Sequence, residues 1–230
     1  APLGERLGHF YRGIGFTVLE GYGLTESCAA TAFNPWDRQK IGTVGQPLPG
    51  SVVRIADDGE VLLHGEHLFT GYWKNESASA EALADGWFHT GDTFRRAPDG
   101  GLVFVDRKKD AIRRRGENIS SFEVEAQAVA HPGVLEAAVV AVPGDEGEDE
   151  VLLVVADRDP GAPVDPAELL EFLRGRLAHF MLPRYIRTLP ELPKTPTGKP
   201  TKHTLRAEGV VAGTWDREAA GIRIRREKIV

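Results

Sequence analysis

Residues 120–156 read SSFEVEAQAVAHPGVLEAAVVAVPGDEGEDEVLLVVA, and this stretch decides the fold of the second half of the chain. Apolar residues recur at helical spacing in its first third, after Ser120 or the next serine as N-cap, and the Pro-Gly pair at 132–133 ends that helix. Two apolar runs of strand length follow, 135–142 and 150–156, with an acidic loop between them. The stretch therefore predicts one helix and then two strands.

The residues that follow predict a second helix and a third strand. Asp165 ahead of Pro166 is typical of a helix N-terminus, and leucines then recur at helical spacing as a stripe that we expect to face the core. We expect this helix to end near His179 and a strand to run over 184–189. The order helix, strand, strand, helix, strand describes a compact α+β domain.

The preceding part of the chain favours β-structure. Strand-like runs at 51–55, 60–63 and 101–105 alternate with turn signals rich in Asp and Gly, and a further strand-like run covers 16–19. The predicted fold class is therefore α+β, with a small antiparallel β subdomain followed by a compact α+β C-terminal domain.

Composition and charge exclude several classes of protein. The 230 residues include 28 Lys plus Arg against 34 Asp plus Glu, a net charge of −6, and 41% are hydrophobic, which is typical of globular and not of disordered chains. No apolar run approaches the roughly 20 residues that cross a bilayer, so we expect no membrane span. The acidic balance argues against nucleic acid as a partner. A single cysteine and the lack of a signal pattern favour a cytoplasmic protein.

Cations are concentrated at 107–115, where six Lys and Arg residues stand with a single acidic residue, Asp110. A solvated basic strand or turn is the commoner explanation of such a cluster. The alternative is a phosphate-binding site, because both cation types bind phosphate oxygens. The cluster lies where the β-rich region gives way to the helical one, a natural place for a hinge and a ligand cleft. The tail 214–230 also ends in four cations, which we interpret as part of a solvated surface strand.

Two segments of the first half carry residues suited to nucleotide chemistry. Residues 21–27, Gly-Tyr-Gly-Leu-Thr-Glu-Ser, combine glycines that permit close backbone approach, an aromatic face, and two oxygen ligands suited to Mg²⁺. Residues 87–92, Trp-Phe-His-Thr-Gly-Asp, end in a carboxylate that we expect to be exposed and able to accept hydrogen bonds from a sugar diol. Each segment taken alone is also explained as a turn next to a strand.

Two later segments present cations. Residues 106–119 contain the basic cluster and the sequence Arg-Gly-Glu-Asn-Ile, and residues 193–202, Pro-Lys-Thr-Pro-Thr-Gly-Lys-Pro-Thr-Lys, form a proline-braced loop. A solvated turn explains either segment alone.

Taken together, the four segments resemble the AMP-forming acyl-CoA synthetase superfamily, also called the adenylate-forming or AMP-binding enzymes. Its patterns Tyr-Gly-x-Thr-Glu, Thr-Gly-Asp, Asp-Arg-x-x-Asp with a following Arg-Gly, and Pro-x-x-x-x-Gly-Lys stand here in the family's order, over about residues 1–209. The segment Arg-Gly-Glu-Asn-Ile-Ser at 115–120 looks most like crotonobetaine/carnitine-CoA ligases.

The resemblance implies a two-step reaction. ATP and a carboxylic acid give an acyl-adenylate and pyrophosphate, and the thiol of coenzyme A then displaces AMP, so ATP/AMP, Mg²⁺ and coenzyme A are the expected cofactors. The catalytic residues implied are Lys199, which bridges the carboxylate and the α-phosphate, and Thr25 and Glu26, which face the phosphates and Mg²⁺. The positive charge of Lys199 lies where negative charge develops.

The resemblance also implies binding and hinge residues. Tyr22, with Gly23 beside it, would contact adenine, and Asp92 and Arg107 would hold the ribose hydroxyls. Lys109 matches the hinge about which the C-terminal domain swings between the two half-reactions. Gly116 and Arg113 would face the pantetheine path in the second conformation.

One family feature is absent from these 230 residues, namely a Gly/Ser/Thr-rich phosphate loop that ends in lysine upstream of Tyr22. We therefore expect this chain alone not to adenylate an acid, and we expect the N-terminal portion of the enzyme to be a partner. The expected parts are the tail of the large AMP-binding domain (1–35), the β subdomain (36–108), the mobile C-terminal domain (109–209) and a tail (210–230). A homodimer is left open.

Two alternative functions are a noncatalytic nucleotide- or CoA-binding module and part of a peptide-synthetase adenylation domain. Two weaker site candidates remain. His64 and His67, with Glu66, could suggest zinc, but their spacing in a strand places the histidines on opposite faces. Cys28 has no activating base nearby in sequence, so we expect a small packed residue.

Overall fold

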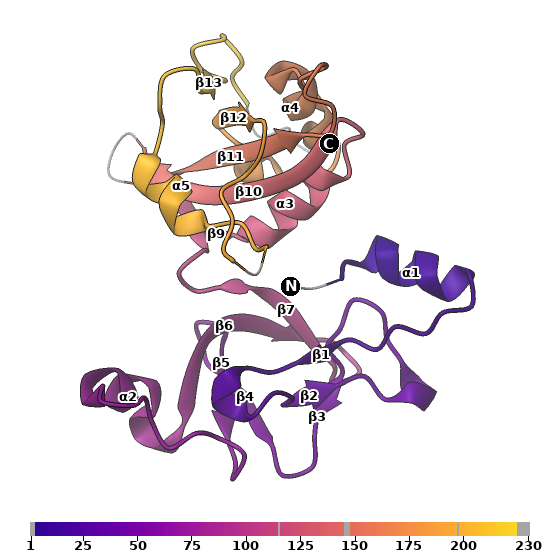
Figure 1. Ribbon diagram of the computed structural model, residues 1–230, viewed down its shortest axis with the longest axis vertical. Helices are drawn as coiled ribbons and strands as arrows, with labels where there is room; N and C mark the ends of the chain where they lie inside the picture. Colours follow the sequence, from indigo (N-terminus) through magenta and orange to yellow (C-terminus); the bar gives the residue numbers. More distant parts are fainter. Residues whose placement is uncertain (1–2, 115, 145–147, 197, 225–230) are drawn as a thin grey trace. The chain divides into compact units, whose positions relative to one another are not determined.

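The computed structural model describes residues 3–114, 116–144, 148–196 and 198–224. The chain divides into two compact units, Ala1–Lys109 and Asp110–Val230, whose elements can be followed in Figure 1. Both units combine helices with sheets, which confirms the predicted α+β class.

The first unit is built on a four-stranded antiparallel sheet in the order β4-β5-β6-β7. Its strands are β4 (Val52–Ile55), β5 (Glu60–His64), β6 (Phe88–Arg96) and β7 (Leu102–Arg107). The three strand-like runs are confirmed as β4, β5 and β7. Strand β6 was not predicted, because Gly and Asp in its middle are residue types that strands usually lack.

A second sheet, two helices and three short 3₁₀ turns complete the first unit. The sheet has the antiparallel order β1-β2-β3. These elements are β1 (Gly21–Tyr22), β2 (Ala32–Phe33), β3 (Gln46–Pro47), α1 (Glu5–Gly13), α2 (Glu76–Ala82), η1 (Thr25–Ser27), η2 (Trp36–Arg38) and η3 (Ala84–Gly86). The strand expected over 16–19 is wrong: Phe16 is 66% exposed, so this apolar run faces no core, and pairing begins only at Gly21.

The second unit has a four-stranded mixed sheet in the order β10-β11-β12-β13, with β11 and β12 parallel. A two-stranded hairpin, β8-β9, precedes it. The elements are β8 (Ile112–Arg114), β9 (Glu117–Ile119), α3 (Ser121–Val129), β10 (Val134–Pro143), β11 (Asp149–Asp157), α4 (Pro166–Arg174), η5 (His179–Met181), β12 (Tyr185–Leu189), α5 (Lys202–Glu208) and β13 (Trp215–Asp216).

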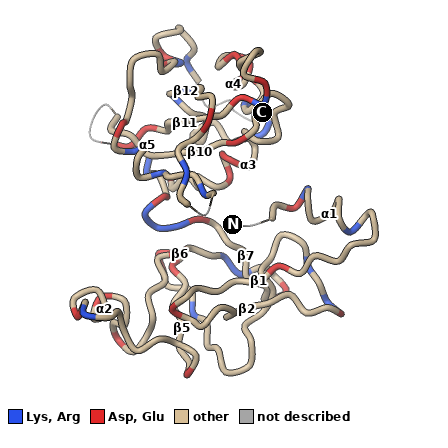
Figure 2. Tube along the Cα trace, in the orientation of Figure 1, with Lys and Arg blue, Asp and Glu red and all other residues tan. Residues whose placement is uncertain are grey.

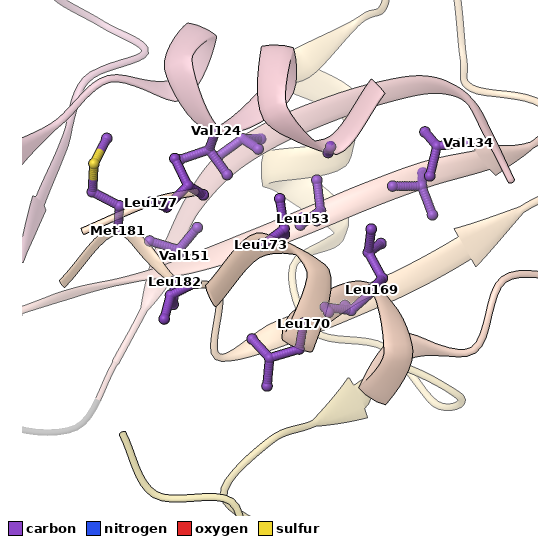
Figure 3. Close-up of a cluster of buried hydrophobic side chains, with 14 of the residues drawn as sticks. Val124, Val134, Val151, Leu153, Leu169, Leu170, Leu173, Leu177, Met181 and Leu182 are labelled. Atoms are coloured by element: carbon purple, nitrogen blue, oxygen red, sulfur yellow. The ribbon is translucent and has the colours of Figure 1, made fainter. Parts of the chain in front are cut away.

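Strand β11 is buried on both faces, which explains why residues 150–156 form an unbroken apolar run. Val151, Leu153 and Val155 contribute to a cluster with α3 and α4, whereas the alternate residues face a second cluster that includes Leu205 of α5. Figure 3 shows Leu153 among side chains from α3 and α4. The central strand therefore connects two cores, one on each side of the sheet.

The predicted helix starts of the second unit are confirmed. Ser120 accepts a hydrogen bond from the backbone N–H of Glu123 at 3.2 Å, and Asp165 caps α4 by accepting from two backbone N–H groups. The expected end of α4 near His179 is wrong, because the helix stops at Arg174. Gly175 follows directly, and glycine favours helix less than any residue except proline.

Every helix within the described ranges is too short or too polar to traverse a lipid bilayer.

Candidate functional site

Three of the predicted site residues, far apart in the sequence, meet in the first unit. The Tyr22 hydroxyl donates to Asp92 Oδ2 at 2.8 Å, and Arg107 Nε lies 3.6 Å from Asp92 Oδ1. Asp92 on β6 is paired directly with Arg107 on β7, and β1 supplies Tyr22. An aromatic ring, a carboxylate and a guanidinium therefore form one polar cluster, which we call the Asp92 cluster.

Asp92 is buried, with 5% of its surface exposed, so the expectation of an exposed carboxylate is wrong. The reason is its position inside β6 rather than in a turn after a strand. Burial raises the pKa of Asp92 above its ordinary value of 3.8, against the hydrogen bond from Tyr22 and the charge of Arg107, which lower it. Once ionised, this carboxylate is a strong acceptor for hydroxyl donors.

The hydroxyl of Tyr22 donates its hydrogen bond to Asp92. Burial, and next the negative charge of Asp92, raise the pKa of Tyr22 well above its ordinary value of 10.0, so the phenol keeps its proton and donates. The ring also contacts Phe94 edge-on, with 4.7 Å between the centroids. These two contacts fix the orientation of the ring.

Thr25 and Glu26 lie together on the 3₁₀ turn η1. Glu26 Oε1 accepts a hydrogen bond from the Tyr72 hydroxyl at 2.9 Å, and Thr25 is exposed. One carboxylate and one hydroxyl on a single turn fit Mg²⁺, which usually keeps several waters and takes one or two carboxylates plus phosphate oxygens. Tyr72 was missed from the sequence because only the tertiary fold brings it to Glu26.

The structure gives Gly23 and Cys28 explanations different from those expected. A Cβ at Gly23 would lie 1.3 Å from the carbonyl oxygen of Ala29, so the loop itself requires glycine here whether or not a ligand approaches. Cys28 is exposed and adopts a positive φ of 51°, so the expectation of a packed cysteine is wrong.

The cations of residues 107–114 lie along the chain from the end of β7 to β8 (Figure 2). Lys108 Nζ lies 2.9 Å from both Asp58 Oδ2 and Glu60 Oε2. Arg114 is 3% exposed and pairs with Glu150 at 2.9 Å. A solvated basic strand or turn is therefore the wrong explanation for the buried Arg114, whereas Lys108 is exposed and pairs with two carboxylates of the first unit.

The residues expected on the pantetheine path belong to the β8-β9 hairpin of the second unit. Arg113 is exposed on β8, and its backbone N–H donates to Asp149 Oδ2 at 3.3 Å. Gly116 is exposed in the turn with a φ of +78°, a conformation that favours glycine. Arg115 lies outside the described residues.

Lys199 is exposed in a closed loop of the second unit, just ahead of α5. Lys194 and Pro200 form an isolated bridge at the base of this loop. Within it, Thr195 N–H donates to the Lys199 carbonyl at 2.8 Å, and Lys199 N–H donates to Thr195 Oγ1 at 3.2 Å. The backbone of Lys199 is therefore held from both sides. Thr197 lies outside the described residues.

His64 and His67, which were considered as zinc ligands, contact different groups. His64 Nδ1 contacts the Gly86 carbonyl at 3.0 Å, whereas His67 Nε2 contacts Ser51 Oγ at 3.3 Å. No group of three or more His, Cys, Asp and Glu side chains among the described residues is arranged to hold a metal ion.

Two family models match this chain. One, described as AMP-binding enzyme, matches residues 1–73, and the other, described as AMP-binding enzyme C-terminal domain, matches residues 123–199. A long-chain-fatty-acid–CoA ligase of Yersinia pestis is 38% identical over 210 residues, covering 86% of this chain and 37% of that protein. The long-chain-fatty-acid–CoA ligase FadD15 of Mycobacterium bovis is 51% identical over 141 residues, covering 61% of this chain and 24% of that protein.

Solved structures agree with these relatives. ATP-bound MatB from Rhodopseudomonas palustris matches with a TM-score of 0.81 and 32% identity, over 90% of this chain and 44% of that one. The o-succinylbenzoate CoA synthetase MenE of Bacillus subtilis, in complex with ATP and magnesium, matches with a TM-score of 0.79 and 30% identity, over 89% and 44%. The chain thus spans less than half the length of these relatives. It belongs to the AMP-binding enzyme superfamily and corresponds to the C-terminal portion of that family's members.

Proposed function

We propose that this chain is part of an acid–thiol ligase, which activates a carboxylic acid with ATP as an acyl-adenylate and transfers the acyl group to coenzyme A. The observation that carries the proposal is the Asp92 cluster, in which three residues of the predicted nucleotide site meet within hydrogen-bond or ion-pair distance. The curated relatives named as CoA ligases support the same reaction class.

The Asp92 cluster suits a nucleoside. The buried Asp92 carboxylate accepts hydrogen bonds from the two ribose hydroxyls, and the half-exposed Arg107 lowers the cost of its charge. Tyr22 holds its ring in a fixed orientation through Asp92 and Phe94, so the ring offers adenine a preformed contact.

Glu26 and Thr25 supply the protein oxygens for Mg²⁺. The hydrogen bond from Tyr72 orients the Glu26 carboxylate, and the exposed Thr25 hydroxyl lies on the same turn. When bound, Mg²⁺ neutralises phosphate charge as the acid's carboxylate approaches.

The second unit provides the mobile groups. Lys199 carries a positive charge to the carboxylate and the α-phosphate, where negative charge develops during adenylation. Lys109, at the division between the two units, is the hinge. Arg113 and Gly116 face pantetheine in the second half-reaction.

We propose a long-chain fatty acid as the acyl substrate, because the relatives from Yersinia and Mycobacterium are named as long-chain-fatty-acid–CoA ligases. The similarity of residues 115–120 to crotonobetaine/carnitine-CoA ligases, the cytoplasmic location and a homodimer stay predictions. The expectation that these 230 residues alone do not adenylate an acid also stays a prediction, and ATP–pyrophosphate exchange with the purified chain tests it.

Nucleotide binding can be tested on the chain as it exists by two-dimensional NMR with AMP at millimolar concentrations. We expect chemical-shift changes concentrated at residues 21–27, Asp92 and Arg107, and we expect Asp92→Asn to remove them. Asp99→Asn is the matched control, because Asp99 is an exposed carboxylate paired with Lys40 away from the cluster. Shift changes that survive Asp92→Asn, or that arise elsewhere, contradict the proposal.

The ligase reaction can be tested by combining this chain with the N-terminal portion of the Yersinia relative. We expect formation of the CoA thioester of a long-chain acid, lost on Lys199→Ala and retained on Lys74→Ala, which removes another exposed lysine. Activity that Lys199→Ala leaves unchanged would refute the role of Lys199.

A further inference from the structure

The residue before the hinge is anchored in the first unit. The Lys108 ammonium contacts Asp58 and Glu60 at 2.9 Å each, and its backbone N–H donates to the Gly91 carbonyl at 2.8 Å. Hydrogen bonds with Asp58 and then Glu60 raise the pKa of Lys108, while the bond from Lys108 lowers the pKa of Asp58. The anchor is therefore an ionised network at neutral pH, and the first unit holds the chain up to Lys108.

The residue after the hinge is anchored in the second unit. Asp110 is 8% exposed, and its Oδ1 lies 2.9 Å from Arg206 Nη2 on α5. Removing a partner from a buried carboxylate is costly, so this pair is not equivalent to an exposed surface pair. Asp110 is consequently fixed to a helix that lies 92 or more residues later in the sequence.

Helix α5 also has a connection to Lys199. The helix begins at Lys202, immediately after the loop that carries Lys199. Lys202 and Arg206 are four residues apart and so lie on one face of the helix. Lys202 Nζ contacts Glu125 Oε1 and Ser121 Oγ of α3, at 2.7 Å each, while Arg206 binds Asp110. One helix face thus holds both the start of the second unit and the end of the Lys199 loop.

We propose that Arg206 is a positioning residue that fixes Asp110 to α5, so that rotation between the two units is confined to Lys109. The loop that carries Lys199 then moves together with the second unit as a rigid body. Hinges consist of a few residues that absorb large φ and ψ changes. Without the Asp110–Arg206 pair, the backbone of Asp110 and Ala111 joins the pivot before β8 begins at Ile112. The value of this device for catalysis rests on the proposed ligase function, because only there must Lys199 reach a defined position.

The joint can be measured without any catalytic assay. One spin label is attached to Cys28, the single cysteine of the chain, which is exposed in the first unit. The second label is attached through Glu171→Cys on the exposed side of α4. Double electron–electron resonance then gives the distribution of distances between the two spin labels, one on each unit. In Arg206→Gln we expect a distribution at least about 1.5 times as wide, because two more residues gain backbone freedom.

Matched variants separate this role from a general stabilising one. Asp110→Asn should widen the distribution as Arg206→Gln does, and the double variant should widen it by less than the sum of the two single changes, since both remove the same ion pair. Arg187→Gln is the control: it removes a 2.7 Å ion pair with Glu208 on the same helix and should leave the width unchanged. Hydrogen exchange of β10 and β11 verifies that the second unit is folded.

The proposal is overturned if Arg206→Gln and Asp110→Asn keep the second unit folded without widening the distribution, or if Arg187→Gln widens it equally. Should Arg206→Gln unfold the second unit, Arg206→Lys replaces it, since a shorter, single-point cation keeps the charge and loses the planar fork; an unchanged width in Asp110→Asn then decides against the proposal. Because no step needs turnover, a failed ligase assay and a failed joint measurement are distinguishable.

Discussion

The ion pair between Arg114 and Glu150 permits a quantitative test of how the β8-β9 hairpin is held. Arg114 Nε lies 2.9 Å from Glu150 Oε2, and both residues are buried. Arg114 Nη1 also donates to the carbonyls of Phe180 and Leu182, at 3.1 Å each. One guanidinium therefore joins β8 to β11 and to the η5 segment, and Arg114→Met removes all these contacts.

The structure sets the expected cost. Removing one partner of a buried ion pair costs about 3–5 kcal/mol, because the other charge stays buried without compensation. Each of the two carbonyls that lose a donor adds about 1–3 kcal/mol. The sum is comparable with the whole stability of a domain, about 5–15 kcal/mol. We therefore expect Arg114→Met to leave the second unit close to its limit of stability, while the first unit, which has its own core, is unaffected.

The double variant Arg114→Met/Glu150→Leu isolates the electrostatic part. Replacing a whole buried pair by apolar side chains is often neutral, so we expect the double variant to recover about 3 kcal/mol and to retain the cost of the two carbonyls. Native-state hydrogen exchange of β10 and β11 reports on the second unit separately. Arg174→Met is the control, because its pair with Glu171 is exposed and worth under about 0.5 kcal/mol.

Two results refute this reasoning. If Arg114→Met lowers the free energy of unfolding by less than about 1 kcal/mol, the buried charge of Glu150 has found another partner or water. The ion pair then does not hold the hairpin as described. If the double variant is as unstable as Arg114→Met alone, the loss arises from shape and not from an uncompensated carboxylate.

The remaining predictions concern the core, the Tyr22 loop and pH. Leu153→Ala should lower the free energy of unfolding of the second unit by about 2–5 kcal/mol in urea titrations, because Leu153 is fully buried. Gly23→Ala should disorder residues near Tyr22 in NMR spectra, since the added Cβ collides with the Ala29 carbonyl. Asp58 has a folded pKa below its ordinary 3.8, so its stabilisation is present above pH 3.8 and disappears as the pH falls through the folded pKa. Lys108→Met should reduce this part of the pH dependence of the urea midpoint, while the hydrogen bond from the Glu60 N–H to Asp58 retains the rest.

The elements that were predicted correctly are those whose formation depends on residues close together in the sequence. The apolar run of β11 needs both faces buried, and Asp165 and Ser120 cap the helices through backbone N–H groups only two or three residues away. The same kind of signal misplaced the end of α4. Leu177 continues the leucine spacing and is buried, although the helix has already ended at Arg174. Spacing alone does not distinguish a further helical turn from a loop that returns a side chain to the same core.

The residues themselves indicated the candidate site only as separate segments, and the resemblance alone placed three of its residues around one nucleotide. The resemblance to a family named Tyr22, Asp92 and Arg107, but no spacing indicates that the Tyr22 hydroxyl bonds to Asp92. Tyr72 and Arg206 escaped notice for the same reason: each acts on a residue, Glu26 or Asp110, that is at least 46 positions away. Such pairs depend on tertiary structure, which single-sequence patterns do not encode.

The pairing of Asp92 with Arg107 depends on the register between β6 and β7. At one end Phe94 pairs with Phe104, but Thr93 pairs with Asp106, so β7 gains one residue at Val105. Without that bulge the pairing would place Asp106, not Arg107, opposite Asp92, and two carboxylates would repel each other. A one-residue shift also turns every later side chain to the other face, so the bulge brings Arg107 to the same face as Asp92. Bulges are common beside active sites for this reason, and the Asp92 cluster therefore depends on a single inserted residue as much as on the charged residues themselves.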